Sequence, residues 1–135
     1  MIELTFRQLL DATGARARTD GFDRPLRGVS TDSRTVEPGQ LFVGLPGPNF
    51  DGSAFAAMAI AAGAAALLVQ GDGDEPGFDV PDGVEVALHP EPLRALGDLA
   101  AWHRSRLKAT VIGITGSCGK TSTKNILPRL LEPLG

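Results

Sequence analysis

The sequence predicts an α/β fold in two parts: a small N-terminal domain that contains a βαβ unit, and the opening elements of a second α/β domain, joined by a connecting helix. Three observations lead to this prediction. Residues 41–69 give a strand-like apolar run, an alanine-rich helical run and a second apolar run, in that order. Residues 91–108 have the apolar spacing of one long helix, and residues 109–123 pass from a β-branched run, which predicts a strand, into a glycine-rich turn and the start of a helix. We expect the boundaries to divide the chain into residues 1–88, 89–108 and 109–135.

The bulk composition excludes several classes of protein. The 135 residues carry a net charge of −3 and no block of lysines and arginines, which argues against a nucleic-acid-binding protein. A single cysteine, Cys118, excludes an internal disulfide and suits a reducing compartment. We expect a cytoplasmic protein without membrane insertion, because residues 54–69 are apolar but too short for a span and the N-terminus lacks the pattern of a signal peptide.

The first predicted helix has signals at both of its ends. Thr5 and Gln8 have the spacing of a capping box, and Gly14 is placed to end the helix. The residues expected on its buried face are Phe6, Leu9, Leu10 and Thr13. A connection that can include a short strand follows, and then a strand is predicted over residues 27–32, which runs into the polar turn Asp32-Ser33-Arg34.

The βαβ unit begins after a turn at Pro38-Gly39, a pair that fits the two central turn positions. The elements expected from there are a strand at residues 41–45, a loop at 46–52, a helix at 54–62 and strands at 64–69 and 84–88. Ser53 is expected to cap the helix, and the alanine content of that helix favours close packing on a sheet.

The longest predicted helix covers residues 91–108, with Pro92 in the first turn, where proline is tolerated. Its expected apolar stripe consists of Leu93, Leu96, Leu99, Ala100, His103 and Leu107. We interpret His103 as a packing or surface residue rather than a ligand, and Trp102 as a packing residue rather than a base-stacking platform.

The stretch with the most specific chemistry is the glycine-rich turn at residues 116–121. Gly116 and Gly119 let the backbone approach a ligand and adopt positive φ, and the helix that follows adds the positive end of its dipole. Lys120 is placed to reach the outer phosphates of a nucleotide, and the Thr121 hydroxyl is placed to ligate Mg²⁺. The predicted nucleotide site consists of Thr115, Gly116, Ser117, Cys118, Gly119, Lys120, Thr121 and Ser122.

This stretch also departs from the usual phosphate-loop pattern. Ile114 stands where the strict motif has glycine, so the fit is to the shorter form Gly-x-x-Gly-Lys-Thr. Cys118 is interpreted as a tolerated small side chain rather than a nucleophile. Pro128 removes a hydrogen bond to Lys124, so the helix is expected to kink or end early. Residues 109–135 are too few for a complete Rossmann-like nucleotide domain, and we expect a truncated one.

Three blocks taken together resemble the Mur ligase family of peptidoglycan synthesis. They are residues 28–43, which include Asp32-Ser33-Arg34, residues 47–55, which include Asp51-Gly52, and residues 116–124. The resemblance covers nearly the whole chain. It implies the N-terminal UDP-sugar domain of that family, a helical connector, and the opening of its ATP-binding domain.

The resemblance implies ATP-driven amide formation in the building of the cell wall, on which cell shape and division depend. The γ-phosphate of ATP passes to a carboxylate of a UDP-linked peptide to give an acyl phosphate, and an amine then displaces the phosphate. Lys120 as the catalytic residue, and Mg²⁺ at Thr121, are expected to neutralise charge during this transfer. Ser117 and Lys124 are most similar to the family member that adds D-alanyl-D-alanine to UDP-N-acetylmuramoyl tripeptide, and the member that adds the third amino acid is the alternative. A monomer is expected.

The resemblance also places the UDP end of the substrate on the N-terminal domain. The residues implied are Ser30, Thr31, Asp32, Ser33, Arg34, Asn49, Asp51 and Gly52. Their hydroxyls and the Arg34 cation suit uracil edges and a diphosphate, and we expect the two groups of residues on neighbouring loops at one edge of the sheet. Simpler roles are open, because Asp32 and Arg34 can form a turn-stabilising ion pair and Asn49 and Asp51 can be Asx-turn residues. Ser53 stands where the family usually has histidine.

Two functions of other classes are also open. One is a stand-alone UDP-sugar-binding or regulatory module without catalysis, and the other is a fragment of a generic phosphate-loop kinase, which the order of the three blocks disfavours. The 135-residue chain by itself is expected to lack ligase activity and to bind ATP weakly or not at all. The reason is that a phosphate loop depends on neighbouring parallel strands and on a metal-binding acid, and this sequence supplies neither.

Overall fold

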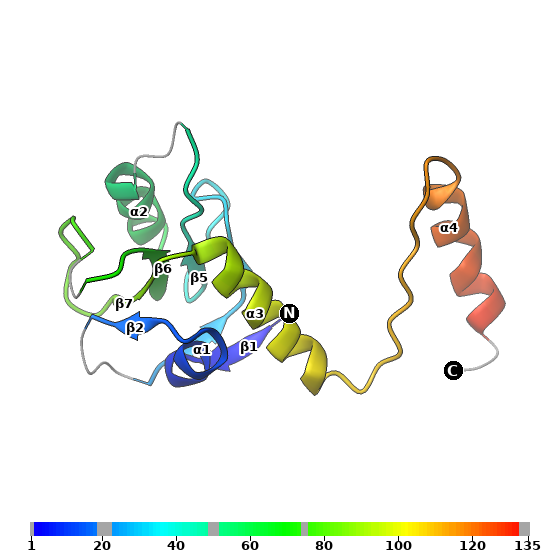
Figure 1. Cartoon of the computed structure of the whole chain (residues 1–135), viewed down its shortest axis with the longest axis horizontal. Helices are drawn as coiled ribbons and strands as arrows, with labels where there is room; N and C mark the ends of the chain where they lie inside the picture. The colour runs from blue at the N-terminus through cyan, green and yellow to red at the C-terminus, as the bar shows by residue number, and fades with distance from the viewer. Residues whose placement is uncertain (1, 19–22, 49–51, 74–75, 133–135) are drawn as a thin grey trace.

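A mixed five-stranded sheet organises the part of the chain up to residue 106 (Figure 1). The computed structural model describes residues 2–18, 23–48, 52–73 and 76–132. In chain order the elements are β1 (Glu3–Thr5), α1 (Phe6–Thr13), β2 (Arg16–Ala17), β3 (Pro25–Arg27), β4 (Val29–Ser30), β5 (Leu41–Val43), α2 (Gly52–Ala61), β6 (Ala66–Gln70), β7 (Glu85–His89), α3 (Pro92–Arg106) and α4 (Lys120–Leu131). The strand order is β2-β7-β6-β5-β4, with β4 to β7 parallel and β2 antiparallel at one edge. The predicted α/β class and the βαβ unit formed by β5, α2 and β6 are confirmed.

The strand expected over residues 27–32 is instead split into two, which corrects that prediction. β3 pairs antiparallel with β1 in a separate two-stranded sheet, whereas β4 pairs in parallel with β5. The division falls at Gly28, whose φ of 114° turns the chain from one sheet to the other. A Cβ at this position would lie 3.1 Å from the side-chain nitrogen Nε2 of Gln40, so glycine also leaves room for the Gln40 side chain.

The capping box of α1 is confirmed. The Thr5 side chain accepts a hydrogen bond from the Gln8 backbone N–H at 3.3 Å, and the Gln8 side chain accepts one from the Thr5 N–H at 2.9 Å. Gly14 ends the helix in the left-handed conformation with φ of 70°. These contacts satisfy backbone groups that a helix end leaves unpaired, and they set the direction in which α1 lies on the sheet.

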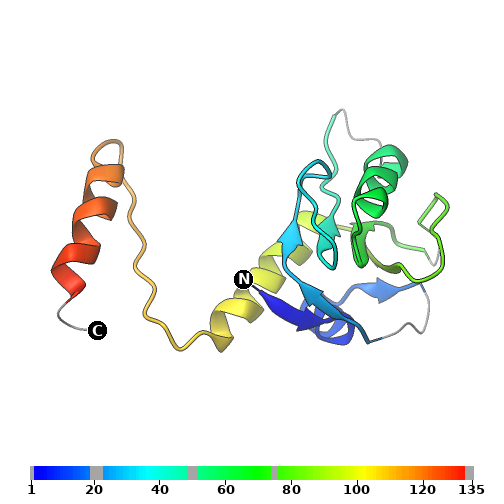
Figure 2. The same cartoon turned by 180° about the vertical axis from the view of Figure 1, so that it is seen from behind.

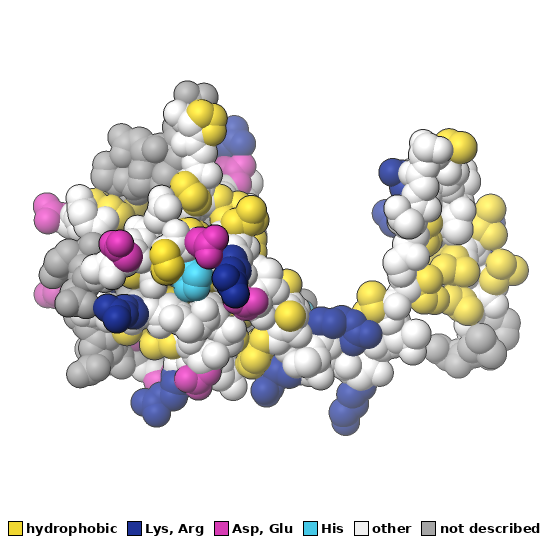
Figure 3. Space-filling view, in the orientation of Figure 1, with side chains coloured by type: hydrophobic (Ala, Val, Ile, Leu, Met, Phe, Trp, Pro, Cys, Tyr) yellow, Lys and Arg dark blue, Asp and Glu magenta, His cyan; other side chains and the backbone are white. Residues whose placement is uncertain are grey.

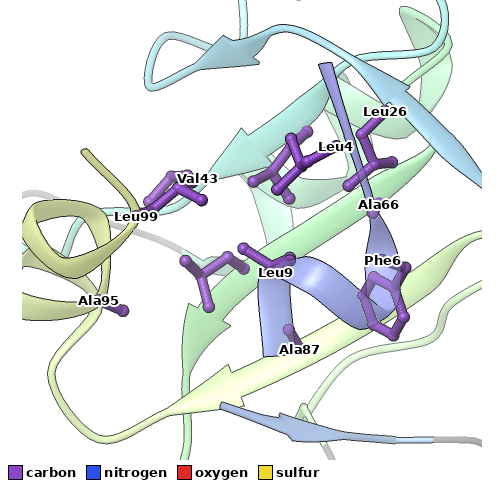
Figure 4. Close-up of a cluster of buried hydrophobic side chains, with 11 residues drawn as sticks. Leu4, Phe6, Leu9, Leu26, Val43, Ala66, Ala87, Ala95 and Leu99 are labelled. Carbon is purple, nitrogen blue, oxygen red and sulfur yellow. The ribbon is translucent and has the colours of Figure 1, made fainter. Parts of the chain in front are cut away.

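Two hydrophobic clusters cover the two faces of the sheet. The first, shown in Figure 4, contains buried side chains of α1, α3 and the strands, among them Leu9, Leu41, Val43 and Leu99. The second contains Phe42 and buried residues of α2 and of the neighbouring strands. Leu41 and Val43 therefore face one cluster and Phe42 the other, as the alternation of a strand requires.

The helix of the βαβ unit begins two residues earlier than predicted. α2 starts at Gly52, so Ser53 lies within its first turn and is not its cap. Ala56 and Ala59 are fully buried, which confirms the predicted close packing of this helix on the sheet. After α2, Gly63 has φ of 99°, and a Cβ there would lie 3.1 Å from the Pro38 Cα. The helix therefore ends against the Pro38-Gly39 turn.

The buried stripe of α3 agrees only in part with the predicted one. The buried residues are Pro92, Ala95 and Leu99, whereas Leu93 is 67% exposed. Leu99 of the predicted stripe is confirmed and Leu96 packs against the first cluster, whereas Leu93 and Ala100 lie outside the buried face. The reason is that α3 packs against α1 with the face that begins at Pro92. Trp102 is half-buried against the first cluster, so its interpretation as a packing residue is confirmed.

Residues 107–119 extend from α3 and lead to α4 (Figures 1 and 2). The strand expected at residues 109–114 is absent from this described segment, because no strand lies beside it to complete the hydrogen-bond ladder. The sequence predicts that the helix kinks or ends early at Pro128, but α4 continues through Pro128 to Leu131, so it does not end early and the kink stays a prediction. None of its residues is buried. In the part of the chain that the structure describes, no helix is both long enough and apolar enough to cross a membrane.

Glu85 is a buried carboxyl at the start of β7. The side chain is 2% exposed, and its carboxylate oxygens have no hydrogen-bond partner among the described residues. Burial raises the pKa of Glu85 to about 7; the Arg24 guanidinium opposes this rise and the Asp23 carboxylate adds to it. The folded chain therefore holds a proton on Glu85 at pH values where the unfolded chain has lost it.

We predict that Glu85→Gln removes a pH dependence of stability. In the wild type, the stability contributed by protonated Glu85 is complete below pH 4.5 and is lost as the pH rises through about 7. This loss is at most about 3 kcal/mol of unfolding free energy, and the uncharged variant avoids it. Urea unfolding at pH 5 and pH 8 measures the difference, with Glu3→Gln at an exposed position as the control. Equal pH slopes for the wild type and Glu85→Gln would contradict the prediction.

Candidate functional site

A tightly hydrogen-bonded turn follows β4 at residues 30–35. The Ser30 hydroxyl donates to the Asp32 carbonyl at 3.0 Å and accepts from the Asp32 N–H at 3.2 Å. The Thr35 N–H donates to the same carbonyl at 3.0 Å, which closes the turn. The Ser30 and Thr35 hydroxyls are therefore used inside the turn, and Ser30 does not line the pocket described below.

Asp32 and Arg34 form a two-pronged ion pair on this turn. Arg34 Nε lies 2.9 Å from Asp32 Oδ1, and Arg34 Nη2 lies 2.7 Å from Asp32 Oδ2. The Arg34 backbone N–H also donates to Oδ1 at 3.0 Å, the pattern of an Asx turn. Arg34 lowers the pKa of Asp32 to about 2, and Asp32 in turn raises the pKa of Arg34. Both groups stay charged across the physiological range.

Ser33, between these two residues, points its hydroxyl away from solvent. It is 5% exposed, and its Oγ has no hydrogen-bond partner among the described residues. A buried hydroxyl without a partner costs folding free energy. Ser33 therefore lies at this turn with a desolvated hydroxyl that no described residue satisfies.

The turn borders a pocket of about 570 Å³. Its lining consists of Thr31, Asp32, Ser33, Arg34, Phe42, Leu45 and Phe55. The polar members all belong to the turn after β4, whereas the apolar members come from β5, the loop after it, and α2. This position at the carboxyl ends of parallel strands is where α/β sheets usually bind ligands.

Four of the eight residues predicted for the UDP substrate line this pocket: Thr31, Asp32, Ser33 and Arg34. Asn49 and Asp51 lie outside the described residues, so their predicted position beside Arg34 stays a prediction. Leu45 and Phe55, on either side of that segment, do line the pocket. The sequence analysis missed Phe42, Leu45 and Phe55 as pocket residues, although the alternation along β5 could have indicated that Phe42 faces α2.

The glycine-rich turn adopts the backbone that its sequence predicted. Gly116 has φ of 149° and Gly119 has φ of 78°, and α4 begins directly after them at Lys120. The Thr123 N–H donates to the Gly119 carbonyl at 3.0 Å. The first turn of α4 contains no acidic residue, so its dipole is open to an anion.

A second pocket, of about 410 Å³, lies beside the start of α4. Its lining consists of Ile112, Ile114, Lys120, Thr121 and Lys124. The structure therefore brings Lys120 and Thr121 together and adds Lys124, to which the sequence analysis gave no ligand role. Figure 3 shows basic side chains near the start of α4 and apolar side chains over its remainder. Among the described residues, no group of three or more His, Cys, Asp or Glu side chains could hold a metal, which leaves Thr121 as the predicted Mg²⁺ ligand.

Comparison with known proteins identifies the family. The family described as "Mur ligase family, catalytic domain" matches residues 25–104, more than half of the chain. The chain belongs to the Mur ligase family. It is 40% identical over 135 residues to the UDP-N-acetylmuramoyl-tripeptide--D-alanyl-D-alanine ligase of Escherichia coli K12, and 38% identical over 134 residues to the UDP-N-acetylmuramoyl-L-alanyl-D-glutamate--2,6-diaminopimelate ligase of Gloeobacter violaceus.

Solved structures agree with the sequence relatives. MurF from Acinetobacter baumannii superposes with a TM-score of 0.81 at 31% identity, over 99% of this chain and 28% of that one. The MurF ligase of Thermotoga maritima, solved in complex with ADP, matches 79% of this chain and 23% of its own, with a TM-score of 0.61 at 33% identity. The chain covers 28% of the Escherichia coli ligase and 26% of the Gloeobacter ligase.

We predict that Ser33→Ala leaves the stability of the chain unchanged or raises it by up to about 1 kcal/mol, because the hydroxyl it removes is buried without a described partner. Ser30→Ala is the matched control and should lower stability by about 1 kcal/mol, since it removes hydroxyl bonds to Asp32 and Thr35. Thermal unfolding followed by circular dichroism measures both variants. A loss for Ser33→Ala as large as that for Ser30→Ala would show that Ser33 has a structural partner.

Proposed function

We propose that this chain is the UDP-substrate-binding part, with the beginning of the ATP-binding part, of a ligase that adds D-alanyl-D-alanine to UDP-N-acetylmuramoyl tripeptide. The observation that carries the proposal is the pocket after β4 and β5. It combines a buried hydroxyl at Ser33 that no described residue satisfies, a cation at Arg34 and an apolar wall that includes Phe55. A nucleoside diphosphate needs these three features, because its base has a planar apolar face and a polar edge and its phosphates are anionic.

The polar and apolar residues of this pocket would contact different parts of the UDP group. The Ser33 side chain lines the pocket, and its hydroxyl would rotate toward the ligand to hydrogen-bond the edge of the uracil, while Arg34 would bind the diphosphate. Leu45 and Phe55 would contact the faces of the base and sugar. Thr31 adds a second hydroxyl at the rim. The identity of 40% with the Escherichia coli ligase supports UDP-N-acetylmuramoyl tripeptide as the molecule that carries this UDP group.

The second pocket is the proposed site for the phosphates of ATP. Lys120 and the N–H groups of the turn at residues 115–122 would bind them, and the Thr121 hydroxyl would be a ligand of the Mg²⁺ that accompanies ATP. Mg²⁺ would supply charge neutralisation during phosphoryl transfer to the tripeptide carboxylate. Lys120 would neutralise charge on the same phosphates. The amine of D-alanyl-D-alanine would then displace phosphate to form the amide.

A second candidate is the ligase that adds the third amino acid of the peptide. The identity of 38% with the Gloeobacter diaminopimelate ligase favours it. The two candidates differ in the peptide on the UDP-sugar and in the incoming amine. In an activity assay of the intact enzyme, turnover of the UDP-tripeptide with D-alanyl-D-alanine supports the first, and turnover of the UDP-dipeptide with diaminopimelate supports the second.

We predict that the 135-residue chain binds UDP-N-acetylmuramoyl tripeptide but shows no measurable affinity for Mg-ATP and no ligase activity. The pocket of Ser33 and Arg34 is built on the packed sheet, whereas every residue from 115 to 126 is exposed and the strand before the turn is not formed. Isothermal titration calorimetry with each ligand tests both halves. Absence of UDP-tripeptide binding would refute the proposed substrate site, and micromolar ATP affinity would refute the incompleteness of the nucleotide site.

We predict that Lys120→Ala in the intact enzyme lowers kcat at least about 1000-fold, because the charge of the transferred phosphoryl group is no longer neutralised. Affinity for the UDP-tripeptide should change by less than about twofold, since the two pockets lie on separate elements. Steady-state kinetics and calorimetry measure the two effects. A comparable loss of UDP-tripeptide affinity would contradict the separation of the sites.

A further inference from the structure

The Asp32 carboxylate is fully engaged within its own turn. Oδ1 accepts from the Arg34 backbone N–H and from Nε, and Oδ2 accepts from Nη2 at 2.7 Å. An anionic carboxylate at the rim of the pocket would also repel the phosphates of a nucleoside diphosphate. Direct contact between Asp32 and such a ligand is therefore unfavourable on both counts.

Arg34 keeps binding capacity while it is held. A guanidinium has five N–H donors, and the contacts with the two Asp32 oxygens use one from Nε and one from Nη2. The Arg34 side chain is 78% exposed, and among the described residues Nη1 forms no hydrogen bond. The edge of the guanidinium formed by its two Nη atoms is thus free for an anion, and this edge can bind a phosphate through two parallel hydrogen bonds.

The ion pair is not needed to close the turn. Hydrogen bonds from Ser30 and Thr35 to the Asp32 carbonyl already close it without the carboxylate. An ion pair as exposed as this one also adds little to folding stability. What the carboxylate does achieve is to hold a long, flexible side chain in a single direction at the rim of the pocket. That restriction lowers the entropy that Arg34 would lose on binding a ligand.

We propose that Asp32 is a positioning residue, which fixes the Arg34 guanidinium for the anionic diphosphate of the UDP substrate and does not itself contact that substrate. This inference rests on the proposed function of the pocket. It assigns Asp32 a role different from the direct substrate contact that the resemblance implies. The opposite arrangement, in which Asp32 withholds Arg34 from the ligand, predicts an effect of opposite sign on affinity.

The test is a double-mutant cycle on the 135-residue chain, with UDP-N-acetylmuramoyl tripeptide as the probe in calorimetry. Asp32→Asn keeps an oxygen for the Arg34 backbone N–H but puts an amide where Oδ2 accepted from Nη2. We expect it to weaken binding about tenfold and to leave the melting temperature within about 2 °C of the wild type. Arg34→Ala should weaken binding at least as much. In the Arg34→Ala background, Asp32→Asn should change affinity by less than about twofold.

The controls make each outcome decisive. Asp98→Asn, the same change at an exposed position on α3, should leave the affinity unchanged. If Asp32→Asn does not fold, Asp32→Ser replaces it, because a serine hydroxyl can still accept from the Arg34 backbone N–H but cannot hold the guanidinium, and the same weakening of about tenfold is expected. Unchanged or tighter binding by Asp32→Asn overturns the inference, and so does an equal loss in the Arg34→Ala background. Failure of the wild type to bind the UDP-tripeptide overturns the proposed function, and the inference with it.

Discussion

The position of β5 between β4 and β6 is the constraint on which the rest of the structure depends. Its three residues are all buried, and parallel pairing on both sides satisfies its backbone. Leu41 and Val43 support the cluster beneath α1 and α3, and Phe42 supports the cluster beneath α2. A strand that is buried on both faces must be apolar throughout, which leaves the loops at its end to carry the chemistry. The loop after β5 and the turn after β4 both lie at the carboxyl ends of these strands, and both line the pocket.

Polar groups at this pocket differ in how far the turn satisfies their hydrogen bonds. The Ser33 hydroxyl has no hydrogen-bond partner in the part of the chain that the structure describes, whereas the hydroxyls of Ser30 and Thr35, a few residues away, are satisfied inside the turn. Ser30 and Thr35 therefore stabilise the turn through their hydroxyls, whereas the Ser33 hydroxyl does not contribute to it. Glu85 shows that an unpartnered buried group is not by itself a sign of a ligand site, since it lies at the amino end of β7, away from the carboxyl edge that forms the pocket.

The C-terminal segment shows how far local sequence can act without a tertiary partner. The positive φ angles of Gly116 and Gly119 and the start of α4 at Lys120 form although nothing from that helix is buried. Both features depend on contacts within a few residues, as in any helix end. The apolar residues Val111 and Ile112 remain 56% and 51% exposed, and their β-branched run forms no strand. A helix closes its hydrogen bonds internally, but a strand needs a neighbour.

By itself, the sequence determined what short-range physics controls: the Thr5–Gln8 capping box, the Pro38-Gly39 turn, the order of elements in the βαβ unit, and the glycine conformations of the turn at residues 116–119. Family resemblance pointed to Ser33 and Arg34, and the structure placed both on one pocket. Only the tertiary structure decided the division at Gly28, the face of α3 that is buried, and the contribution of Phe42 and Phe55 to the pocket. These features depend on which surfaces meet across residues distant in the chain, and spacing along one segment does not contain that information.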